Sequence, residues 1–396
     1  MRILVGITGG IAAYKSAQIV RSLTELGHDV KVLPTANALK FIGSATLEAL
    51  SHNSIDPDLY TQVADVKHIK LAQEAELVII APATASFLAR YANGIADDLL
   101  LNVLLATTAP VVIAPAMHSE MWNHPATRKN TQALISNSVH IIEPGTGRLT
   151  GNDTGVGRMA EPSEIVSRAL SIAKHQLDLA GKAVVVAAGG TREPIDSVRF
   201  IGNYSSGRQG IALATSARDR GAKVTLISAN IDVPLPAGIE VVEVTTHAQL
   251  DEAIQIAIQD CDALIMPAAV SDFRVAEITE GKIHRSVSQE LEIKLIANSD
   301  ILAKLTSTRT GQRPIVVGFA AEVVQSQQEL EIAGRKKLDS KGCDLIVANN
   351  VSNQAIFRSD DSQVLIIDSQ SSIPITGTKH EVAEAVLDRV ASLLAS

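Results

Sequence analysis

Short runs rich in Val, Ile and Leu recur between longer amphipathic stretches, and this alternation constrains the fold more than any other feature of the chain. Each run is apolar throughout, which is typical of a strand covered by helices on both faces. The alternation predicts an α/β protein whose domains are three-layer αβα structures with mainly parallel sheets. The predicted strands are RILVGIT, DVKVLPT, ELVIIAPAT, APVVIAPAM and VHIIEP in the first half, and KAVVVAA, AKVTLIS, IEVVEV, CDALIMPAA, PIVVGFA, CDLIVANN and VLIID in the second.

The length of 396 residues is sufficient for two or three domains. Segment 163–179 carries apolar residues at helical spacing, and Gly181-Lys182 after it begins a fresh strand. The two halves also begin alike, each with a strand, a Gly-Gly turn and a helix. We therefore expect two parallel-sheet domains, at 1–178 and 181–396.

Composition excludes several classes of protein. The formal net charge of −8 and the absence of a long basic run argue against nucleic acid as a partner. Two cysteines, Cys261 and Cys343, are too few for a disulfide framework or a Cys-rich zinc site. The longest apolar stretch begins at Leu99, is interrupted by Asn102 and falls far short of the roughly 18 residues of a membrane span. These features predict a cytoplasmic α/β enzyme with no membrane partner.

The turn Thr8-Gly9-Gly10 follows the first predicted strand and leads into a predicted helix. Backbone N–H groups and a helix N-terminus then face whatever lies above the sheet, so the turn is either a phosphate cradle or an ordinary strand-to-helix connection. The dinucleotide pattern GxGxxG is absent, which argues against a Rossmann NAD site.

Histidines and a glycine-rich segment provide further candidates in the first half. His68 begins a predicted helix leading into the strand that ends near Thr84, so it is either a carboxylate ligand or a surface histidine. His118 and His124 form a conceivable metal pair, but their spacing is not HExxH and no third ligand is evident. In segment 145–159, five of the first thirteen residues are glycine, which fits either a flap over a site or a surface linker.

In the second half the long segment 191–210 replaces a short turn, and loops of that length inside a domain are usually functional. Its stretch GNYSSGRQG approaches a P-loop, but Arg208 stands in place of Lys and no Ser or Thr follows, so a P-loop is rejected. Lys282, Lys337 and Lys341 either hold phosphates or form a solvated charged face. Asp272, at a strand end, either holds a metal or a ribose or caps a helix.

Several of these segments together resemble one known family, the bifunctional phosphopantothenoylcysteine decarboxylase and phosphopantothenate–cysteine ligase of bacterial coenzyme A synthesis. The motifs similar to flavin-containing cysteine decarboxylases are GITGGIAAYK, KHIKLA, IIAPATASFLA, GIADDLL and PAMHSEMW. Those similar to the CTP-using ligase are AAGGTREPIDSVRFIGNYSSGRQG, AAVSDFR, GKI, VGFAAE and KLDSKGCDLIVANN. The resemblance covers essentially the whole chain. It implies a flavodoxin/Rossmann-like flavoprotein domain at 1–178, followed by a Rossmann-like ligase domain at 181–396.

The resemblance implies that the second half condenses 4′-phosphopantothenate with L-cysteine at the expense of CTP and Mg²⁺, through an acyl-cytidylate. Cations would stabilise the phosphoryl transfer. By motif match, Asn203 steadies the acyl-cytidylate, Lys282, Lys337 and Lys341 bind phosphates, and Asp272 binds the nucleotide or its Mg²⁺. The remaining residues expected at the CTP site are Met266, Pro267, Ala268, Ser299, Asp300, Ile301, Leu302 and Phe319.

The same resemblance implies that the first half decarboxylates 4′-phosphopantothenoylcysteine to 4′-phosphopantetheine. An N-acyl cysteine has no electron sink for the carbanion left by CO₂, so the implied cofactor, FMN, first oxidises the thiol to a thioaldehyde. His68 would orient the substrate carboxylate, and His118, Met121 and Trp122 would form a substrate clamp. The residues expected to bind FMN are Gly9, Gly10, Ile11, Ala12, Thr35, Thr84, Ala85 and Ser86.

The chain departs from the family pattern at three positions. The clamp has His118 where the family usually has Asn, and the nucleotide site has Ser299 where it often has Pro. The flap segment 147–159 contains no Cys, although many relatives use a flap Cys as the proton donor of the final reduction; Thr150 lies near that position. The last proton then comes from Asp153, His118 or water, or the first half releases an enethiol.

The resemblance further implies homo-oligomers: trimers of the flavin domain and dimers of the ligase domain, which closed symmetry combines into a dodecamer. Two rival functions are an oxidoreductase whose second domain only binds nucleotide, and a non-catalytic flavin-binding partner protein. The TREPID block and the absent GxGxxG oppose the first, and His68 with a full ligase domain opposes the second. The retained alternative is a working ligase fused to a degenerate flavin domain.

Overall fold

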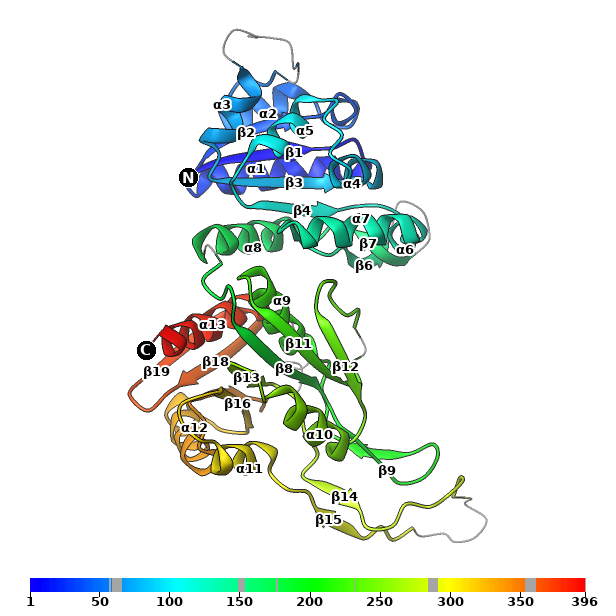
Figure 1. Ribbon diagram of the computed structural model, residues 1–396, viewed down its shortest axis with the longest axis vertical. Helices are drawn as coiled ribbons and strands as arrows, with labels where there is room; N and C mark the ends of the chain where they lie inside the picture. The colour runs from blue at the N-terminus through cyan, green and yellow to red at the C-terminus, as the bar shows by residue number, and fades with distance from the viewer. Residues whose placement is uncertain are drawn as a thin grey trace. The chain divides into compact units, whose positions relative to one another are not determined.

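The computed structural model describes residues 1–56, 58, 66–148, 154–175, 177–231, 233–283, 291–352 and 361–395. The chain divides into two compact units, Met1–Gln176 and Leu177–Ser396 (Figure 1). Each unit has its own main sheet and its own apolar clusters on the two faces of that sheet. Each is therefore a separate α/β domain.

The first unit contains a five-stranded parallel sheet in the order β2-β1-β3-β4-β5. Its strands are β1 Arg2–Ile7, β2 Asp29–Pro34, β3 Leu77–Ala83, β4 Val111–Pro115 and β5 His140–Ile141. This is the flavodoxin-like order, in which ligands bind at the carboxyl ends of β1 and β3. Strand β5 is shorter than the run VHIIEP predicts, although the Ile142 N–H beyond its end still donates to the Ile113 carbonyl at 2.9 Å.

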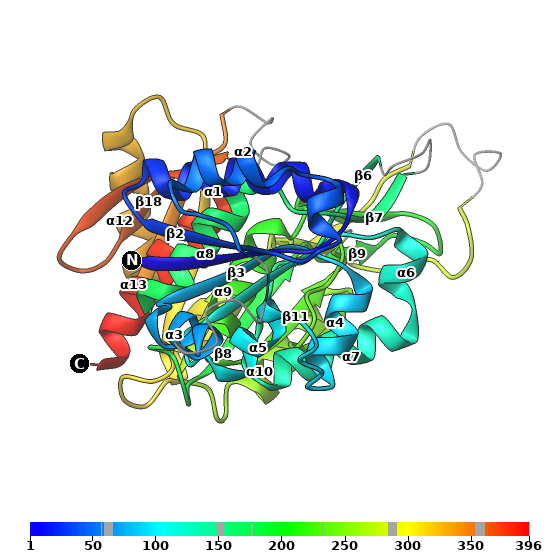
Figure 2. The same ribbon diagram turned by 90° about the horizontal axis from the view of Figure 1, so that it is seen from above.

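Helices cover both faces of this sheet, as Figure 2 shows for α1 and α2 on one side and α3, α4 and α5 on the other. Alternate residues of β1 enter the two clusters: Ile3 and Val5 pack with α1 and α8, whereas Leu4 packs on the opposite face. The helices are η1 Ile11–Lys15, α1 Ser16–Glu25, η2 Ala38–Lys40, α2 Ser44–Ser51, α3 Lys67–Glu74, α4 Ala85–Ala92, α5 Leu99–Ala106, α6 Ser119–Asn123, α7 Pro125–Ser136 and α8 Pro162–His175. An antiparallel hairpin joins β6 Gly145–Arg148 to β7 Thr154–Arg158.

The second unit contains an eight-stranded sheet in the order β12-β11-β8-β13-β16-β17-β18-β19. The first six strands in that order are parallel and reproduce the Rossmann order 3-2-1-4-5-6; β18 and β19 are antiparallel additions. The strands are β8 Ala183–Gly189, β11 Lys223–Ala229, β12 Glu240–Val244, β13 Ala263–Met266, β16 Ile315–Glu322, β17 Leu345–Asn350, β18 Asp361–Ile367 and β19 Ser372–Thr378. The predicted αβα fold with mainly parallel sheets is therefore confirmed, although the run VLIID forms an antiparallel strand.

Helices α9 Arg208–Asp219 and α13 Lys379–Ala395 cover one face of the second sheet, and α10 His247–Ala257, α11 Ile301–Thr308 and α12 Gln327–Lys341 cover the other. Two small hairpins project beside the sheet, one pairing β9 Arg192–Pro194 with β10 Phe200–Gly202 and the other pairing β14 Phe273–Val275 with β15 Leu295–Ala297. Within the described ranges, no helix is both long and apolar enough to cross a bilayer.

Candidate active sites

Thr8 ties together the strand ends at which the first candidate site lies. Its buried Oγ1 donates to the Pro82 carbonyl at 2.8 Å and accepts from the Thr84 N–H at 3.1 Å. The ends of β1 and β3 are thereby held at a fixed separation. Thr8 is absent from the residues predicted for this site, although a polar side chain directly before Gly-Gly at a strand end was a usable signal.

The two glycines after Thr8 have different roles. A Cβ at Gly9 would lie 2.5 Å from the Cβ of Asn37, so Gly9 lets the segment after β2 pack against the turn. A Cβ at Gly10 would meet only the Thr84 Cγ2, at 3.7 Å, so the backbone there borders open space. The predicted α-helix does not begin directly after Gly10, because a 3-10 turn comes first and α1 starts at Ser16.

The other residues expected to bind flavin lie at the carboxyl ends of β1, β2 and β3, which are neighbours in the sheet. Thr84 caps α4 by accepting from the Phe87 N–H at 3.3 Å, with Ala85 and Ser86 in the first turn. Thr35 follows β2 and lines a cavity of about 230 Å³ together with Asp98. Ile11 and Ala12 lie in the 3-10 turn. The structure thus brings these residues to one edge of the sheet.

The predicted substrate residues of the first unit lie on α3 and α6. His68 is half-buried in the first turn of α3, and residues 57 and 59–65 before it lie outside the described part of the chain. His118 and Met121 are exposed, whereas Trp122 is only 3% exposed and packs in the core with the Arg128 guanidinium 5.0 Å from its ring centroid. Within this unit Trp122 therefore anchors α6 and does not present an open face.

His124 has a structural role, because its Nδ1 accepts from the Ala126 N–H at 3.2 Å and caps α7. Among the residues that the structure describes, no group of three or more His, Cys, Asp or Glu side chains could hold a metal ion. The His118 and His124 metal pair is therefore not supported, and neither is a preformed metal cluster around Asp272.

The β6–β7 hairpin packs directly on the predicted clamp. The Met117 N–H donates to the Gly157 carbonyl at 3.0 Å, and a Cβ at Gly157 would lie 2.1 Å from the Met117 carbonyl oxygen. Gly157 also has a φ of +151°, so both backbone conformation and space require glycine there. This contact fits the predicted flap over a site. Thr150 and Asp153, the positions considered for the last proton, lie outside the described residues.

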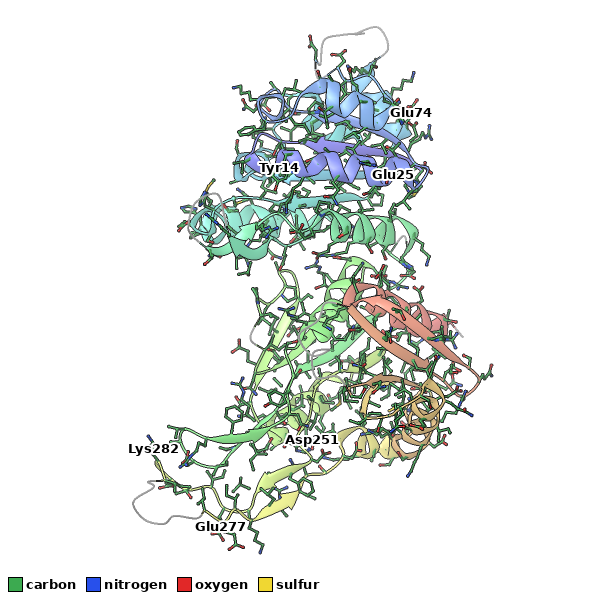
Figure 3. The ribbon with its side chains drawn as sticks, turned by 180° about the vertical axis from the view of Figure 1, so that it is seen from behind. Tyr14, Glu25, Glu74, Asp251, Glu277 and Lys282 are labelled. Carbon is green, nitrogen blue, oxygen red and sulfur yellow. The ribbon has the colours of Figure 1, made fainter. Side chains whose placement is uncertain are left out.

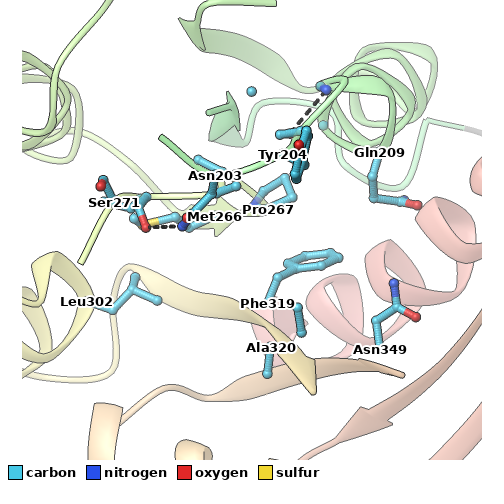
Figure 4. A pocket seen from close by; sticks show the side chains of 18 of the residues that line it. Asn203, Tyr204, Gln209, Met266, Pro267, Ser271, Leu302, Phe319, Ala320 and Asn349 are labelled. Carbon is cyan, nitrogen blue, oxygen red and sulfur yellow. Dashed lines mark hydrogen bonds between the residues drawn. The ribbon is translucent and has the colours of Figure 1, made fainter. Parts of the chain in front are cut away.

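A cavity of about 560 Å³ opens at the carboxyl ends of β8, β13 and β16 in the second unit. This is where the Rossmann strand order reverses, the usual ligand position in such sheets. Figure 4 shows Asn203 and Pro267 on one side of the cavity, with Phe319 and Asn349 on the other. Of the predicted ligase residues, those that line it are Asn203, Met266, Pro267, Ala268, Asp272, Ser299, Asp300, Ile301, Leu302, Phe319, Lys337 and Lys341.

Close helix packing places the 191–210 loop at this cavity. A Cβ at Gly210 would lie 2.1 Å from the Cβ of Ala188, so α9 approaches β8 closely only because residue 210 is glycine. Asn203 is held by donating through Nδ2 to the Val270 carbonyl at 2.9 Å. Other residues also line the cavity that the sequence did not predict for it, among them Arg208 and Lys379. Arg208 was considered only as a departure from a P-loop, and Lys379 gave no recognisable signal.

Two of the predicted cations reach the cavity wall through ion pairs. Lys341 Nζ lies 2.8 Å from Asp300 Oδ2, and Lys337 Nζ lies 2.7 Å from Glu322 Oε1. Burial alone would raise the pKa of Asp300, but hydrogen bonds from Lys341 and from the Ala303 N–H lower it below its ordinary value. The carboxylate is therefore charged at neutral pH and holds Lys341 beside the cavity.

Lys282 is the exception among the predicted ligase residues, because it is exposed and lies outside the cavity lining. Figure 3 shows it on the same projecting segment as Glu277. The backbone around it is held by the TREPID motif: Ser197 N–H donates to the Gly281 carbonyl at 3.2 Å, and Ile283 N–H donates to Asp196 Oδ2 at 3.1 Å.

Asp196 is the centre of this attachment. It accepts from the backbone N–H groups of Val198 and Arg199, both at 2.9 Å, and from the Arg199 guanidinium. The guanidinium hydrogen bond above all, together with the backbone donors, holds the pKa of Asp196 well below its usual range. Asp196 was not predicted individually, although it is the last residue of the TREPID block.

Together, the two folds and their sites define a class of protein: a flavoprotein domain fused to a Rossmann-like domain with a nucleotide-sized cavity. The Flavoprotein family model matches residues 1–174, and the model of the DNA/pantothenate metabolism flavoprotein C-terminal domain matches residues 179–394. The chain belongs to the family of coenzyme A biosynthesis bifunctional proteins, CoaBC, to which it is similar along its whole length.

Three relatives illustrate that similarity. The chain is 45% identical to CoaBC of Mycolicibacterium smegmatis, covering 100% of this chain and 98% of that protein. It is 46% identical to CoaBC of Mycobacterium tuberculosis strain H37Rv, covering 100% and 97%. It is 40% identical to CoaBC of Vibrio cholerae, covering 98% and 96%. A crystal structure of the C-terminal domain of a CoaBC protein is 31% identical over 55% of this chain and 98% of that chain, with a TM-score of 0.46.

Proposed function

We propose that the chain catalyses two consecutive steps of coenzyme A biosynthesis. The second unit condenses 4′-phosphopantothenate with L-cysteine using CTP, and the first decarboxylates the product to 4′-phosphopantetheine. One observation carries the proposal: residues assigned to CTP from separate motifs line a single cavity at the strand-order reversal of the second sheet. The family membership agrees with it.

The ligase reaction needs activation of a carboxylate, which is a poor acyl donor. The substrate carboxylate attacks the α-phosphorus of CTP and displaces pyrophosphate; the cysteine amine then attacks the acyl carbon and releases CMP. Charge on the phosphates is stabilised by fixed cations, and Lys337 and Lys341 are held at the cavity by their carboxylate partners. Asn203, fixed through Val270, would contact the acyl-cytidylate. Asp272 would bind Mg²⁺ or the nucleotide.

Lys282 needs a further step to take part in this reaction, because it lies outside the cavity lining. The attachment of its flanking residues to Asp196 and Ser197 keeps it on the projecting segment. We propose that Lys282 acts on the phosphates after that segment meets a ligand or a second copy of the chain.

The strand ends of the first unit fit a flavin mononucleotide. Gly10 borders open space, and β1 and β3 are locked together by Thr8 at the position where flavodoxin-like sheets bind ligands. Bound FMN would accept and return a hydride at the substrate thiol carbon, supplying the electron sink that decarboxylation needs. Thr84, Ala85 and Ser86 would hold the cofactor with residues 9–12 and Thr35.

The chain's own residues then bind the substrate. His68 would orient the carboxylate that leaves as CO₂, and His118 with Met121 would close on the substrate beneath the hairpin. Trp122, packed in the core, supports that segment. Both cysteines of the chain, Cys261 and Cys343, belong to the second unit, so the last proton comes from another donor. His118, Asp153 and water are the candidates.

The decisive experiment incubates purified protein with phosphopantothenate, cysteine, CTP and Mg²⁺, and measures CMP release and product mass. We expect CMP and the mass of phosphopantetheine, and much less CMP when ATP replaces CTP. A matched pair of variants separates the halves: K341M should lower CMP release, whereas H68N should leave it intact and retain the product's carboxylate. A carboxylated or enethiol product from the wild type would refute complete decarboxylation and favour the ligase with a degenerate flavin unit. No CMP would refute the ligase assignment.

We further propose that the protein works in the cytoplasm as a homo-oligomer, a dodecamer built from flavin-unit trimers and ligase-unit dimers. Large apolar side chains exposed on each unit support buried contacts between copies, among them Ile11 and Tyr14 on the first and Phe273 and Ile296 on the second. Native mass spectrometry would test the stoichiometry, and a monomer at micromolar concentration would refute it.

A further inference from the structure

His247 lies outside the ligase cavity but contacts its wall. It is the first residue of α10, it is 6% exposed, and it is not among the residues that line the cavity. Its ring Nε2 lies 2.8 Å from the backbone carbonyl oxygen of Ser299. A carbonyl only accepts, so Nε2 carries the proton and donates it. His247 is held in turn, because its backbone N–H donates to the buried carboxylate of Glu193 at 2.8 Å.

The carbonyl that His247 holds belongs to the segment that forms the nucleotide side of the cavity. Ser299 and Asp300 both line the cavity. On one side of Ser299, the Asn298 N–H donates to the Asp272 carbonyl at 2.8 Å. On the other side, Asp300 caps α11 through the Ala303 N–H at 3.1 Å and holds Lys341 at 2.8 Å. The imidazole of His247, which does not itself line the cavity, fixes the backbone between these attachments.

A second contact shows that α10 and the segment after Ser299 are joined side by side. Lys304, on α11, pairs with Asp251 of α10 at 2.8 Å. Asp251 comes four residues after His247 on the same helix face, so the two contacts lie one turn apart. The ion pair joins the two helices, whereas the imidazole contacts the backbone of the cavity wall. The two contacts can therefore be removed separately.

We propose that His247 is a positioning residue for nucleotide binding, which fixes the Ser299 carbonyl and so aims Asp300 and Lys341 at the cavity. This inference rests on the proposed ligase function. Loss of the single hydrogen bond that His247 donates weakens CTP binding by about 3- to 10-fold. Turnover at saturating CTP changes less than about twofold, since bound nucleotide restores the wall.

Three variants test the proposal by two readouts, the KM for CTP in the CMP-release assay and the Kd for CTP by titration calorimetry. H247A should raise both about 3- to 10-fold while kcat stays within about twofold. H247Q keeps a donor near the position of Nε2 and should restore most of the affinity. D251N breaks the ion pair that docks α10 and should leave KM and Kd unchanged. The thermal midpoint of each variant reports its folding.

Unchanged KM and Kd in H247A would overturn the proposal, and so would an equal loss of affinity in D251N, because the effect would then be general docking of α10. A loss in H247Q as large as that in H247A would also overturn it, since the donor would not be what matters. Failure of the proposed function is recognised separately: the wild type would release no CMP, whereas calorimetry would still compare CTP binding by the variants.

Discussion

Replacing Arg220 by Met tests whether a buried charge cluster holds the start of the second unit together. Arg220 follows α9 and is 2% exposed. It donates to Asp178 through Nε at 2.9 Å and Nη2 at 2.6 Å, and to Asp388 through Nη1 at 2.8 Å. Glu384 lies 3.5 Å from Nη1. Asp178 lies just after the division between the units, so the cluster ties the junction to α9 and α13.

The expected loss in the free energy of unfolding depends on how exposed the carboxylate partners of Arg220 are. Removing one partner of a buried ion pair costs about 3–5 kcal/mol, because the other charge stays buried without compensation. The side chains of Asp178 and Asp388 are 34% and 42% exposed, so water recovers part of that loss. Glu384 is 14% exposed and still lies 3.8 Å from His380 Nδ1. We therefore expect R220M to lose no more than about 3 kcal/mol. For a unit of this size, that lowers the thermal midpoint by no more than about 6–12 °C.

Differential scanning calorimetry measures this effect, and the transition that CTP raises is assigned to the second unit by linkage. The matched control is R21M, which breaks an exposed pair with Glu25 on α1, whose side chains are 67% and 63% exposed. That change should barely move the first-unit transition, because water screens an exposed ion pair. If R220M moves the second-unit transition no more than the control moves the first, the cluster does not stabilise the junction and our reasoning is wrong.

Three further predictions concern single positions. G157A would place its Cβ 2.1 Å from the Met117 carbonyl oxygen. We therefore expect the decarboxylation rate to fall at least about tenfold while CMP release stays unchanged. Equal decarboxylation rates for G157A and the wild type in a product-mass assay would contradict this prediction. The arginine partner of Asp196 lowers the pKa of this carboxyl in the folded state. The carboxylate therefore stabilises the fold fully when the pH is above the ordinary pKa of about 3.9. That stabilisation is lost as the pH falls towards and through the lowered pKa. D196N should therefore unfold more easily in urea at pH 7, and its deficit should shrink between about pH 4 and pH 2; a deficit independent of pH would contradict this. Burial raises the pKa of the Cys261 thiol to about 11 and that of Cys343 to about 12. Neither thiol should therefore react with Ellman's reagent at pH 8 until the protein is denatured. Rapid reaction of the native protein would contradict this prediction, because it would show that a thiol is accessible.

Local patterns were sufficient to predict the strands of both main sheets except β19, and they indicated candidate ligand-binding edges. Apolar runs covered on both faces, such as the one that ends at Met266, identify parallel strands, and polar or glycine residues directly after them mark the carboxyl edge. Thr84 and Asp272 were found in this way. The run VLIID was predicted as a strand of a mainly parallel sheet, but it forms an antiparallel strand. Composition does not distinguish a parallel strand from an antiparallel strand at the end of a sheet.

Motif recognition assigned candidate roles that geometry alone would not suggest, yet it could not say which side chains reach a cavity. Lys282 and Lys341 carry equal weight as motif residues, but only Lys341 lines the cavity, since Asp300 holds it there. Trp122 matches a substrate clamp by motif, and packing against the core buries it. A motif records residue types in order, whereas burial depends on everything that packs around them.

The sequence by itself determined the class of fold and indicated two domains and candidate ligand positions along the chain, because these follow from the period of the apolar pattern and from residues at strand ends. Only the tertiary structure decided that His247 holds the carbonyl of Ser299, or that Arg220 meets Asp178 and Asp388. Such partners lie 42 to 168 positions apart in the chain. They meet because burying the apolar faces of helices against a sheet fixes where each backbone runs, and no local pattern carries that information.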